Sequence, residues 1–435
     1  MNSKTLNKDF FSFLAKTPTP FHAVSILQSE LSLNQFTELD EGTPWKLEQG
    51  KRYFCIRNGS IIAFTIGSDT DFSHGFRIIG AHTDSPSLQL KPHTKSGCEP
   101  YIVGGVEKYG GALLSTWFDR ELSLAGRVSY TTADGSHKTG LINFNRPILY
   151  IPSLAIHLNR SVNEGQEINP QTHLSPVLAQ AIGRQIPEMR TVVLEQLIKE
   201  RPEQQPCRVN GFDLFCYDLN KPSCFGLNNE FIAAPRLDNL ISCFVGLKAI
   251  IQAGEQTNTL LICSNHEEIG SRSNSGALGN FVFSTLSRIF KSNQEKLISL
   301  HNSFLLSLDN AHASHPNYQD SSDKDHTVLL NHGPVIKTNA NQRYCSNGLT
   351  ASVLRILAAE LEIICQDFVM KSDMACGSTI GPLTSAQLGV AAVDMGIPTW
   401  GMHSIREVTG TSDPLGLYKL VCHFINKEIL PPFND

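Results

Sequence analysis

The sequence of 435 residues lacks the features that would assign it to several common classes of protein. Its 36 Lys and Arg residues are outnumbered by 41 Asp and Glu residues, so the net charge of -5 offers no basic surface for a nucleic acid. No apolar run approaches the ~18 residues that a membrane span needs. The N-terminal stretch MNSKTLNKDFFSFLAK is charged throughout and lacks the apolar segment of a signal peptide. We therefore expect a cytoplasmic protein that binds neither nucleic acid nor membrane.

Paired cysteine motifs are absent as well. The 11 cysteines are scattered without any C-x-x-C spacing, a pattern typical of reduced thiols rather than of disulfides or a thiolate zinc site. The sequence also lacks G-x-S-x-G, which argues against a serine hydrolase, and H-E-x-x-H, which argues against a helical zinc protease.

What is present is an ordinary globular composition, with 41% apolar and 18% charged residues, and a length that suggests two or three domains. Strand-like and helical patterns alternate in residues 1–92 and 232–435 and predict an α/β domain. Strands separated by helices predict a mixed, mostly parallel sheet that is flanked by helices on both faces. Residues 93–231 have alternating strand patterns and several Pro and Gly residues, and we interpret them as an inserted β-rich domain.

The individual elements follow from periodicity and from helix start and stop signals. Helices are expected in residues 7–16, 20–32, 239–254, 279–292, 349–364 and 416–429. Strands are expected in residues 51–57, 60–67, 76–85, 258–264, 302–309 and 389–396.

Acidic and histidine side chains occur where three of these strands end. The residues in question are His82, Asp84, Glu267, Glu268 and Asp309. Because ligands of an open α/β sheet bind outside the carboxyl ends of its strands, we expect these side chains to share one edge of the sheet. Asp238, just before a predicted helix, and His403, in the loop GMHSIRE, are suited to join them.

So many carboxylates at one edge would repel each other unless a cation lay among them. Nitrogen and carboxylate oxygen ligands without thiolates suit zinc, manganese or cobalt, and two divalent metals about 3.5–4 Å apart form a known hydrolytic centre. Taken singly, each residue has a structural explanation as well: Asp238 could cap a helix and Asp309 a turn. The repeated placement at strand ends favours a metal hydrolase.

Several long motifs resemble the M18 family of metalloaminopeptidases, which includes aspartyl aminopeptidases and the vacuolar aminopeptidase I type. These motifs are GAHTDSPSLQLKP, YGGALLSTWFDRELSLAGRV, IPSLAIHLNR, APRLDN, NHEEIGS, LDNAHASHPNY, GSTIGP and GMHSIRE. They span about residues 20 to 430, so the resemblance covers essentially the whole chain.

The resemblance implies two zinc ions per chain and a role for each motif residue. His82 and Asp309 would bind one ion, Glu268 and His403 the other, and Asp238 would bridge them. Glu267 would be the general base, and Asp84 would orient His82.

The resemblance also implies an architecture and an assembly. The catalytic domain would have a phosphorylase/hydrolase-like fold, and residues 93–231 would form an inserted dimerisation domain. Dimers would assemble into a tetrahedral dodecamer, in which His157 reaches the active site of a neighbouring subunit. One position departs from the family pattern, because Asn265 stands where the family often has Asp, and an outer-sphere charge at that position is absent.

The expected reaction is release of the N-terminal residue from a peptide. Glu267 would take a proton from a metal-activated water and pass it to the leaving amine. Lys337 is the candidate cation for an acidic N-terminal residue, although the aminopeptidase I branch prefers neutral residues such as leucine. Two other classes stay open: a dinuclear N-acyl amide hydrolase, which would accept N-blocked substrates, and a non-enzymatic assembly protein, which would not need these residues.

Overall fold

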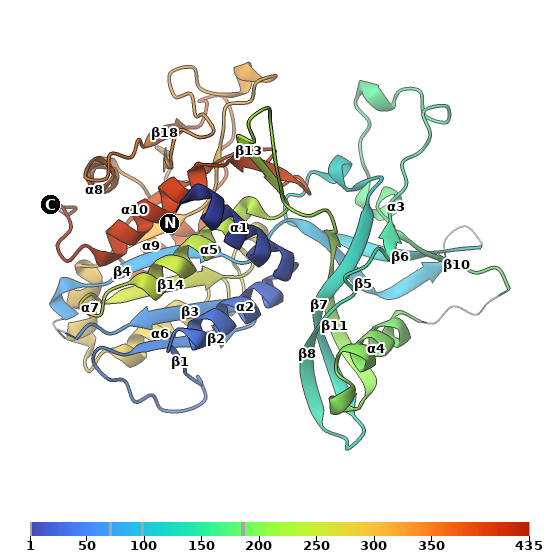
Figure 1. Ribbon diagram of the computed structural model, residues 1–435, viewed down its shortest axis with the longest axis horizontal. Coiled ribbons are helices and arrows are strands. Elements are labelled where there is room, and N and C mark those ends of the chain that lie inside the picture. Colours follow the sequence, from blue (N-terminus) through green and yellow to red (C-terminus); the bar gives the residue numbers. More distant parts are fainter. Residues whose placement is uncertain (1, 69–71, 97–99, 184–187, 435) are drawn as a thin grey trace. The chain divides into compact units, whose positions relative to one another are not determined.

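The computed structural model describes residues 2–68, 72–96, 100–183 and 188–434, and these form two compact units (Figure 1). The first unit comprises Met1–Asp84, Pro222–Met402 and Glu407–Asp435, and the second comprises Ser85–Lys221 and His403–Arg406. Cys98 lies outside the described residues, and the other ten cysteines have free thiols. In the described ranges no helix combines the length and the apolar character that crossing a membrane requires.

A mixed sheet of nine strands is the framework of the first unit, in the order β1-β2-β3-β14-β4-β15-β19-β17-β18. The strands are β1 (Thr37–Glu38), β2 (Arg52–Arg57), β3 (Ser60–Thr65), β4 (Arg77–His82), β14 (Thr259–Ser264), β15 (Phe304–Leu308), β17 (Val335–Thr338), β18 (Gln366–Val369) and β19 (Ala391–Gly396). The four central strands β14, β4, β15 and β19 are parallel, and β3 and β17 pair antiparallel at either side.

Helices cover both faces of this sheet. One apolar cluster packs residues of α1 (Ser3–Lys16), α2 (Pro20–Leu33), α5 (Leu237–Gln252), α8 (Gly348–Ala359) and α10 (Asp413–Asn426) against one face, and α1, α5 and α10 are seen together in Figure 1. A second cluster packs α6 (Phe281–Ile289), α7 (Asn293–His301) and α9 (Ile380–Leu388) against the other. Successive strand residues point to opposite faces, so Leu306 joins the first cluster and Leu305 the second. The predicted fold class is confirmed.

The helix boundaries follow local chemistry. Thr19 caps α2 by accepting the backbone N–H of His22, and Pro20 occupies the first turn, where its missing N–H costs nothing. Asn347 and Thr350 form a reciprocal capping box at the start of α8. The predicted helix at 279–292 is shorter than expected, because α6 ends at Ile289 and the chain becomes extended at Phe290.

A small five-stranded sheet also belongs to the first unit, in the order β12-β13-β21-β20-β16. Its strands are β12 (Ser223–Phe225), β13 (Phe231–Ala234), β16 (Ala311–His312), β20 (Pro398–Trp400) and β21 (Glu407–Gly410). Strand β13 leads directly into α5, and β21 pairs with β13 so that Ala234 lies opposite Glu407. This sheet was not predicted, because its strands are two to four residues long and come from distant parts of the sequence.

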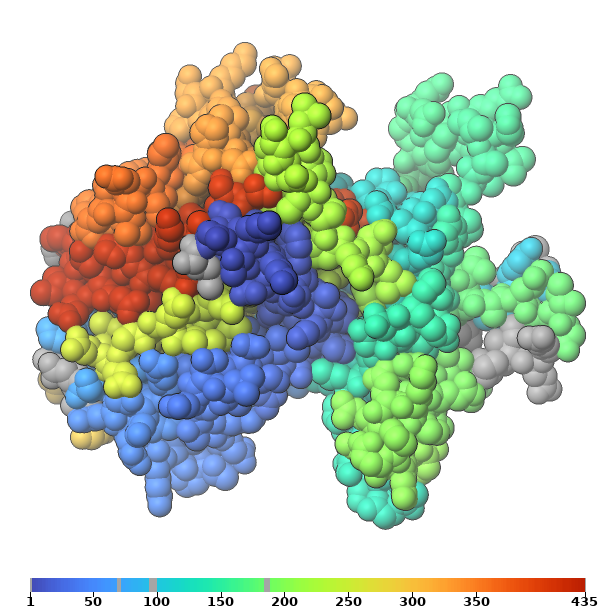
Figure 2. Space-filling model, viewed as in Figure 1, coloured from blue at the N-terminus to red at the C-terminus, as the bar shows by residue number. Residues whose placement is uncertain are grey.

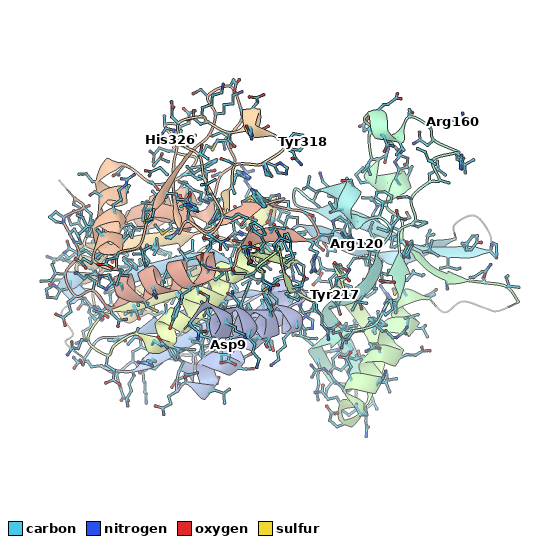
Figure 3. The ribbon with its side chains drawn as sticks, turned by 45° about the horizontal axis from the view of Figure 1, so that its top comes forward. Asp9, Arg120, Arg160, Tyr217, Tyr318 and His326 are labelled. Carbon is cyan, nitrogen blue, oxygen red and sulfur yellow. The ribbon has the colours of Figure 1, made fainter. Side chains whose placement is uncertain are left out.

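A seven-stranded antiparallel sheet dominates the second unit, in the order β11-β5-β6-β10-β9-β7-β8. The strands of this sheet are β5 (Ser87–Ser96), β6 (Tyr101–Tyr109), β7 (Glu121–Thr132), β8 (His137–Asn143), β9 (Leu149–Tyr150), β10 (Val177–Gln180) and β11 (Pro206–Asp218). The helices α3 (Pro170–His173) and α4 (Met189–Glu200) belong to the same unit. The loop after β9 forms a green lobe that projects from this unit, and Arg160 marks it (Figures 2 and 3). The dimerisation role of this region stays a prediction.

Candidate metal centre

Three parallel strands deliver the predicted residues to one edge of the nine-stranded sheet. His82 is the last residue of β4 and lies opposite Ser264, the last residue of β14. Strand β15 runs parallel on the other side of β4, and Asp309 follows it directly. The parallel register therefore brings the sequence regions around residues 82, 267 and 309 together, as the positions of the strand ends predict.

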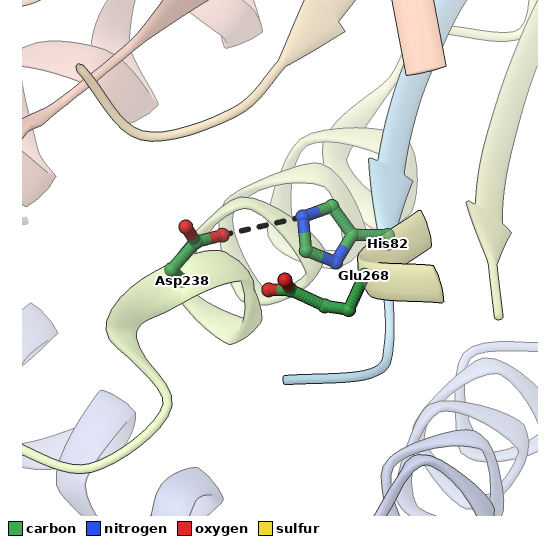
Figure 4. Close-up of side chains that lie close together, drawn as sticks. All are labelled: His82, Asp238 and Glu268. Carbon is green, nitrogen blue, oxygen red and sulfur yellow. Dashed lines mark ion pairs between the residues drawn. The ribbon is translucent and has the colours of Figure 1, made fainter. Parts of the chain in front are cut away.

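His82 lies at the middle of this group and is only 1% exposed. Its Nε2 atom is 3.2 Å from Oδ1 of Asp238, 3.4 Å from Oδ1 of Asp309 and 4.0 Å from Oε2 of Glu267. Its Nδ1 atom is 3.0 Å from the backbone oxygen of Asp84, which can only accept a hydrogen bond. The ring is thus held through Nδ1, and Nε2 faces the carboxylates (Figure 4).

The buried carboxylate of Asp84 also organises the turn that carries the two adjacent glutamates. Its Oδ1 accepts the backbone N–H of Glu267 and its Oδ2 accepts that of Glu268, each at 3.2 Å. The turn begins at His266, whose φ of 67° is left-handed, and continues into the short 3-10 helix Glu267–Ile269. One carboxylate therefore fixes the backbone from which both glutamate side chains leave.

Asp238 enters the same site from the first turn of α5. Its backbone N–H donates to Oε2 of Glu407, a residue of β21 that is 1% exposed, at 3.0 Å. The neighbouring Asn239 donates from Nδ2 to the backbone oxygen of Leu308 at 2.7 Å and so links α5 to the end of β15. These bonds place the Asp238 carboxylate, itself buried, against His82.

The donor set has the chemistry of a divalent metal site. One ligand atom each from His82, Asp238 and Glu268 lie within 4.8 Å of one another (Figure 4). An imidazole nitrogen with carboxylate oxygens and no thiolate suits zinc, manganese or cobalt. Asp309 adds a carboxylate on the His82 side, so the residues present fit a divalent cation.

The electrostatics of these side chains agree with a site that a cation completes. Burial raises the pKa of Glu267 to about 8, and Asp309 and Asp238 add to this rise while His82 opposes it. Burial also raises the pKa of Glu268 well above its usual value, with Asp238 next in importance. Burial alone would lower the pKa of His82, but Asp238 and Asp309 raise it well above the usual value. Without a cation the group therefore holds extra protons.

Comparisons with known proteins identify the family. The family model described as aminopeptidase I zinc metalloprotease (M18) matches residues 13–425. A "Probable M18 family aminopeptidase 2" of Stutzerimonas stutzeri (strain A1501) is 47% identical over 427 residues, which cover 98% of this chain and 99% of that relative. The chain belongs to the M18 family of aminopeptidases. It is accordingly a metallo-aminopeptidase, a hydrolase.

Solved M18 structures share the fold. A chain from the cryo-EM structure of the Ape4 and Nbr1 complex superposes on this M18 aminopeptidase with a TM-score of 0.93 at 37% identity, covering 97% of this chain and 86% of that chain. A chain of the S. cerevisiae mApe1 dodecamer gives a TM-score of 0.82 at 27% identity, covering 96% and 95%. The predicted resemblance to the family is confirmed.

Three further predicted site residues lie outside the group of carboxylates that contacts His82. His403 is grouped with the second unit, where Nδ1 lies 3.3 Å from the backbone oxygen of Gly111, and its role as a ligand stays a prediction. His157 is exposed on the loop after β9, and its role also stays a prediction. Lys337 is 1% exposed and its Nζ lies 3.0 Å from Oδ2 of Asp309, and its role in binding an acidic N-terminal residue stays a prediction.

Sequence reasoning did not connect two buried carboxylates of this M18 aminopeptidase, Glu407 and Asp394, with the candidate metal centre. Asp394 had a signal, because it is an acidic residue inside the apolar strand sequence VAAVDMG, where a charge requires a partner. Glu407 had none, because the sequence gives no indication that β21 lies beside the start of α5.

Proposed function

We propose that this M18 aminopeptidase removes N-terminal residues with two divalent metal ions, zinc in the first instance, and with Glu267 as the general base. The ligands would be His82 and Asp309 for one ion, Glu268 and His403 for the other, and Asp238 for both. The observation that carries this proposal is the convergence of the Asp238, Asp309 and Glu267 carboxylates within 4.0 Å of the His82 Nε2 atom. Such a group of buried and half-buried acids has little reason to exist without cations among them.

Bound divalent ions would polarise the scissile carbonyl and lower the pKa of the attacking water. Glu267 lies beside His82. Of the two glutamates in the turn formed by His266, Glu267 and Glu268 (the HEE turn), it is the one outside the ligand group of His82, Asp238 and Glu268. A carboxylate in that position can accept the proton of the water and return it to the leaving amine. Asp84 contributes by holding the Glu267 backbone, which limits where that carboxylate can go.

We also propose a preference for acidic N-terminal residues, Asp or Glu. The support is Lys337, a buried cation that lies 3.0 Å from the proposed ligand Asp309. An ammonium at this depth favours a substrate carboxylate over an apolar side chain. A preference for leucine or another neutral residue is the second candidate within the family. An N-acyl amide hydrolase is disfavoured by membership of an aminopeptidase family.

Self-association is part of the proposal. The similar mApe1 structure is described as a dodecamer, and the loop that carries His157 exposes three apolar side chains in this chain. These are Leu154 at 57%, Ile156 at 46% and Leu158 at 75% exposure. Exposed apolar groups on one projecting loop favour a contact with another copy, in which His157 would approach a neighbouring active site.

The test compares peptides that begin with Asp, Glu or Leu, using the purified metal-loaded protein and an N-acetylated peptide as the control. Release of Asp and Glu at least about tenfold faster than Leu supports the acidic preference. Faster release of Leu contradicts that preference but leaves the aminopeptidase activity standing. Cleavage of the N-acetylated peptide contradicts the requirement for a free amine.

The base assignment has its own test in a matched pair of variants. Glu267→Gln should retain the metal content of the wild type while turnover falls by about 10²–10⁴-fold. Glu268→Gln should instead lose bound metal, because it removes a charged ligand. Measured metal content and turnover of the two variants separate the roles, and undiminished turnover by Glu267→Gln would sink the assignment.

A further inference from the structure

Lys337 is a buried cation that donates two hydrogen bonds to the segment that carries Asp309. Its Nζ atom donates to Oδ2 of Asp309 at 3.0 Å and to the backbone oxygen of Asn310 at 3.1 Å. An amine that donates to a carboxylate at this distance is an ammonium, and a buried ammonium persists only where its counter-charges are held in place.

The two carboxylate oxygens of Asp309 have different neighbours. Oδ2 is bound by Lys337, whereas Oδ1 lies 3.4 Å from Nε2 of His82. Only Oδ1 is thus directed toward the candidate metal centre. The orientation of Asp309 depends on where the Lys337 side chain ends.

Asp394 lies directly opposite Lys337 in the antiparallel pair of β17 and β19, so the two side chains share one face of the sheet. Asp394 is fully buried, and its carboxylate accepts the backbone N–H of Cys345 at 2.6 Å and the hydroxyl of Thr379 at 2.8 Å. A Cβ atom at Gly381 would lie 2.6 and 2.7 Å from its two oxygens, so this close approach needs glycine. These contacts hold the Asp394 carboxylate in place on the same face of the sheet as Lys337.

We propose that Asp394 is a positioning residue of the metal centre, which acts through Lys337 to keep Asp309 turned so that a single oxygen faces the metal. The proposal rests on Asp309 being a ligand, as set out under the proposed function. With Asp394 neutral, Lys337 would keep one counter-charge instead of two. It would then bind Asp309 more strongly and compete with the metal for that carboxylate.

The test measures zinc binding by the full chain against a competing chromogenic chelator. Wild type should bind two zinc ions, and Asp394→Asn should weaken one of the two by about tenfold or more. In a Lys337→Met background the same substitution should change zinc affinity by less than about twofold, because the connection to Asp309 is already gone.

Asp413→Asn is the matched control. Asp413 is another fully buried carboxylate of the first unit, and it accepts the backbone N–H groups of Asn331 at 2.8 Å and Gly410 at 3.1 Å. Its neutralisation should lower the unfolding midpoint without changing zinc affinity. This control separates loss of a buried carboxylate in general from loss of Asp394.

The outcomes are distinct. Wild type with two zinc ions and an Asp394→Asn variant of unchanged affinity overturns the positioning role and leaves the proposed function standing. An equal loss of affinity with and without Lys337 also overturns it, because the effect then does not pass through Lys337. A wild type that binds fewer than two zinc ions contradicts the dinuclear proposal itself.

If Lys337→Met does not fold, the visible spectrum of cobalt-loaded Asp394→Asn decides, and a spectrum identical to wild type overturns the role.

Discussion

A single side chain, Asp84, holds the two glutamates of the HEE turn. Its two oxygens accept the backbone N–H groups of Glu267 and Glu268, while its backbone oxygen holds the ring of His82. The family resemblance implies only that Asp84 orients His82. The geometry adds that Asp84 links the end of β4 to the turn after β14, so that the proposed metal ligand Glu268 and the proposed base Glu267 share one support.

We expect Asp84→Asn to impair the site even though it preserves shape. The amide oxygen can accept one of the two backbone N–H groups, but the amide nitrogen is a donor and would face the other. The variant should lose about 1–3 kcal/mol of unfolding free energy in urea and show a lower turnover. Thr83→Val is the control, because it removes only a hydroxyl, which donates to the Gly59 oxygen at 2.7 Å and lies 3.4 Å from the Ser264 oxygen, and it should keep turnover. Wild-type turnover in Asp84→Asn would contradict the linking role.

Asn265 is suited to its surroundings in a way that Asp is not. Its Nδ2 donates to the backbone oxygen of Asn58 at 3.0 Å, and its Oδ1 accepts the N–H of His266 at 2.9 Å. In Asn265→Asp a carboxylate oxygen would face the Asn58 oxygen, and we expect a loss of about 1–3 kcal/mol at pH 7.

The loss in Asn265→Asp should depend on pH. Repulsion from the carbonyl raises the folded-state pKa of the new carboxyl above its unfolded value, so stability is lost as pH rises. Urea unfolding at pH 5 and pH 7 measures this, with wild type as the reference. A variant that matches wild type at both values would show that the turn accommodates Asp.

At the scale of elements, the start of α9 is fitted to β19 through Asp394 and Gly381. Gly381→Ala would bring a methyl group within 2.6–2.8 Å of the Asp394 oxygens and the Cys345 Sγ atom. We expect a loss of about 1–3 kcal/mol, measured by thermal or urea unfolding. Gly377→Ala is the control, because nothing lies within 4 Å of its added Cβ atom, and it should change stability by about 0.5 kcal/mol or less. Equal effects of the two variants would contradict the close fit.

The sequence predicts a feature of the structure where a single strand or helix determines that feature by itself. Apolar runs end at His82, Ser264 and Leu308, and their parallel arrangement alone places the next residues at one edge. It is uninformative where separate elements must meet. Neither the Asp394–Lys337 pairing nor the bond from Asp238 to Glu407 could be predicted, because each joins two elements whose contact is set by tertiary packing. The very short strands of the five-stranded sheet leave no periodicity to detect.

At the scale of the whole molecule, metal removal should change how stability depends on pH. The folded-state pKa of Glu267 without metal is about 8, against a usual value of 4.5. A raised carboxyl pKa means that the folded state binds the proton more tightly, so stability falls as pH rises from about 4.5 to 8. The raised pKa of His82 acts in the same direction.

We therefore expect the chelator-treated protein to be less stable at pH 8 than at pH 5 by about 2–5 kcal/mol in urea. Metal-loaded protein should not show this slope, because bound cations keep the carboxylates charged. Chelator-treated Glu267→Gln should show a smaller slope than chelator-treated wild type. A metal-free protein as stable at pH 8 as at pH 5 would contradict the repulsion among these acids.

Assembly is the other property of the whole molecule that can be tested. Leu158 is 75% exposed on the projecting loop, and Leu33, at 78% exposure, ends α2. If the loop contacts another copy, Leu158→Glu should reduce the mass measured by light scattering, whereas Leu33→Glu should leave it unchanged. Equal masses for all three proteins would argue against a role of this loop in assembly.

The support that Asp84 gives to both Glu267 and Glu268 has a consequence for how relatives of this protein can differ in sequence. With the proposed roles, a substitution at Glu267 or Glu268 would damage one function each, and a lineage could lose one and keep the other. A substitution at Asp84 affects both at once, and no single change elsewhere restores two N–H acceptors in the same place. Asp84 should therefore persist in any relative that keeps either glutamate in its role, and drift only where both glutamates have lost theirs.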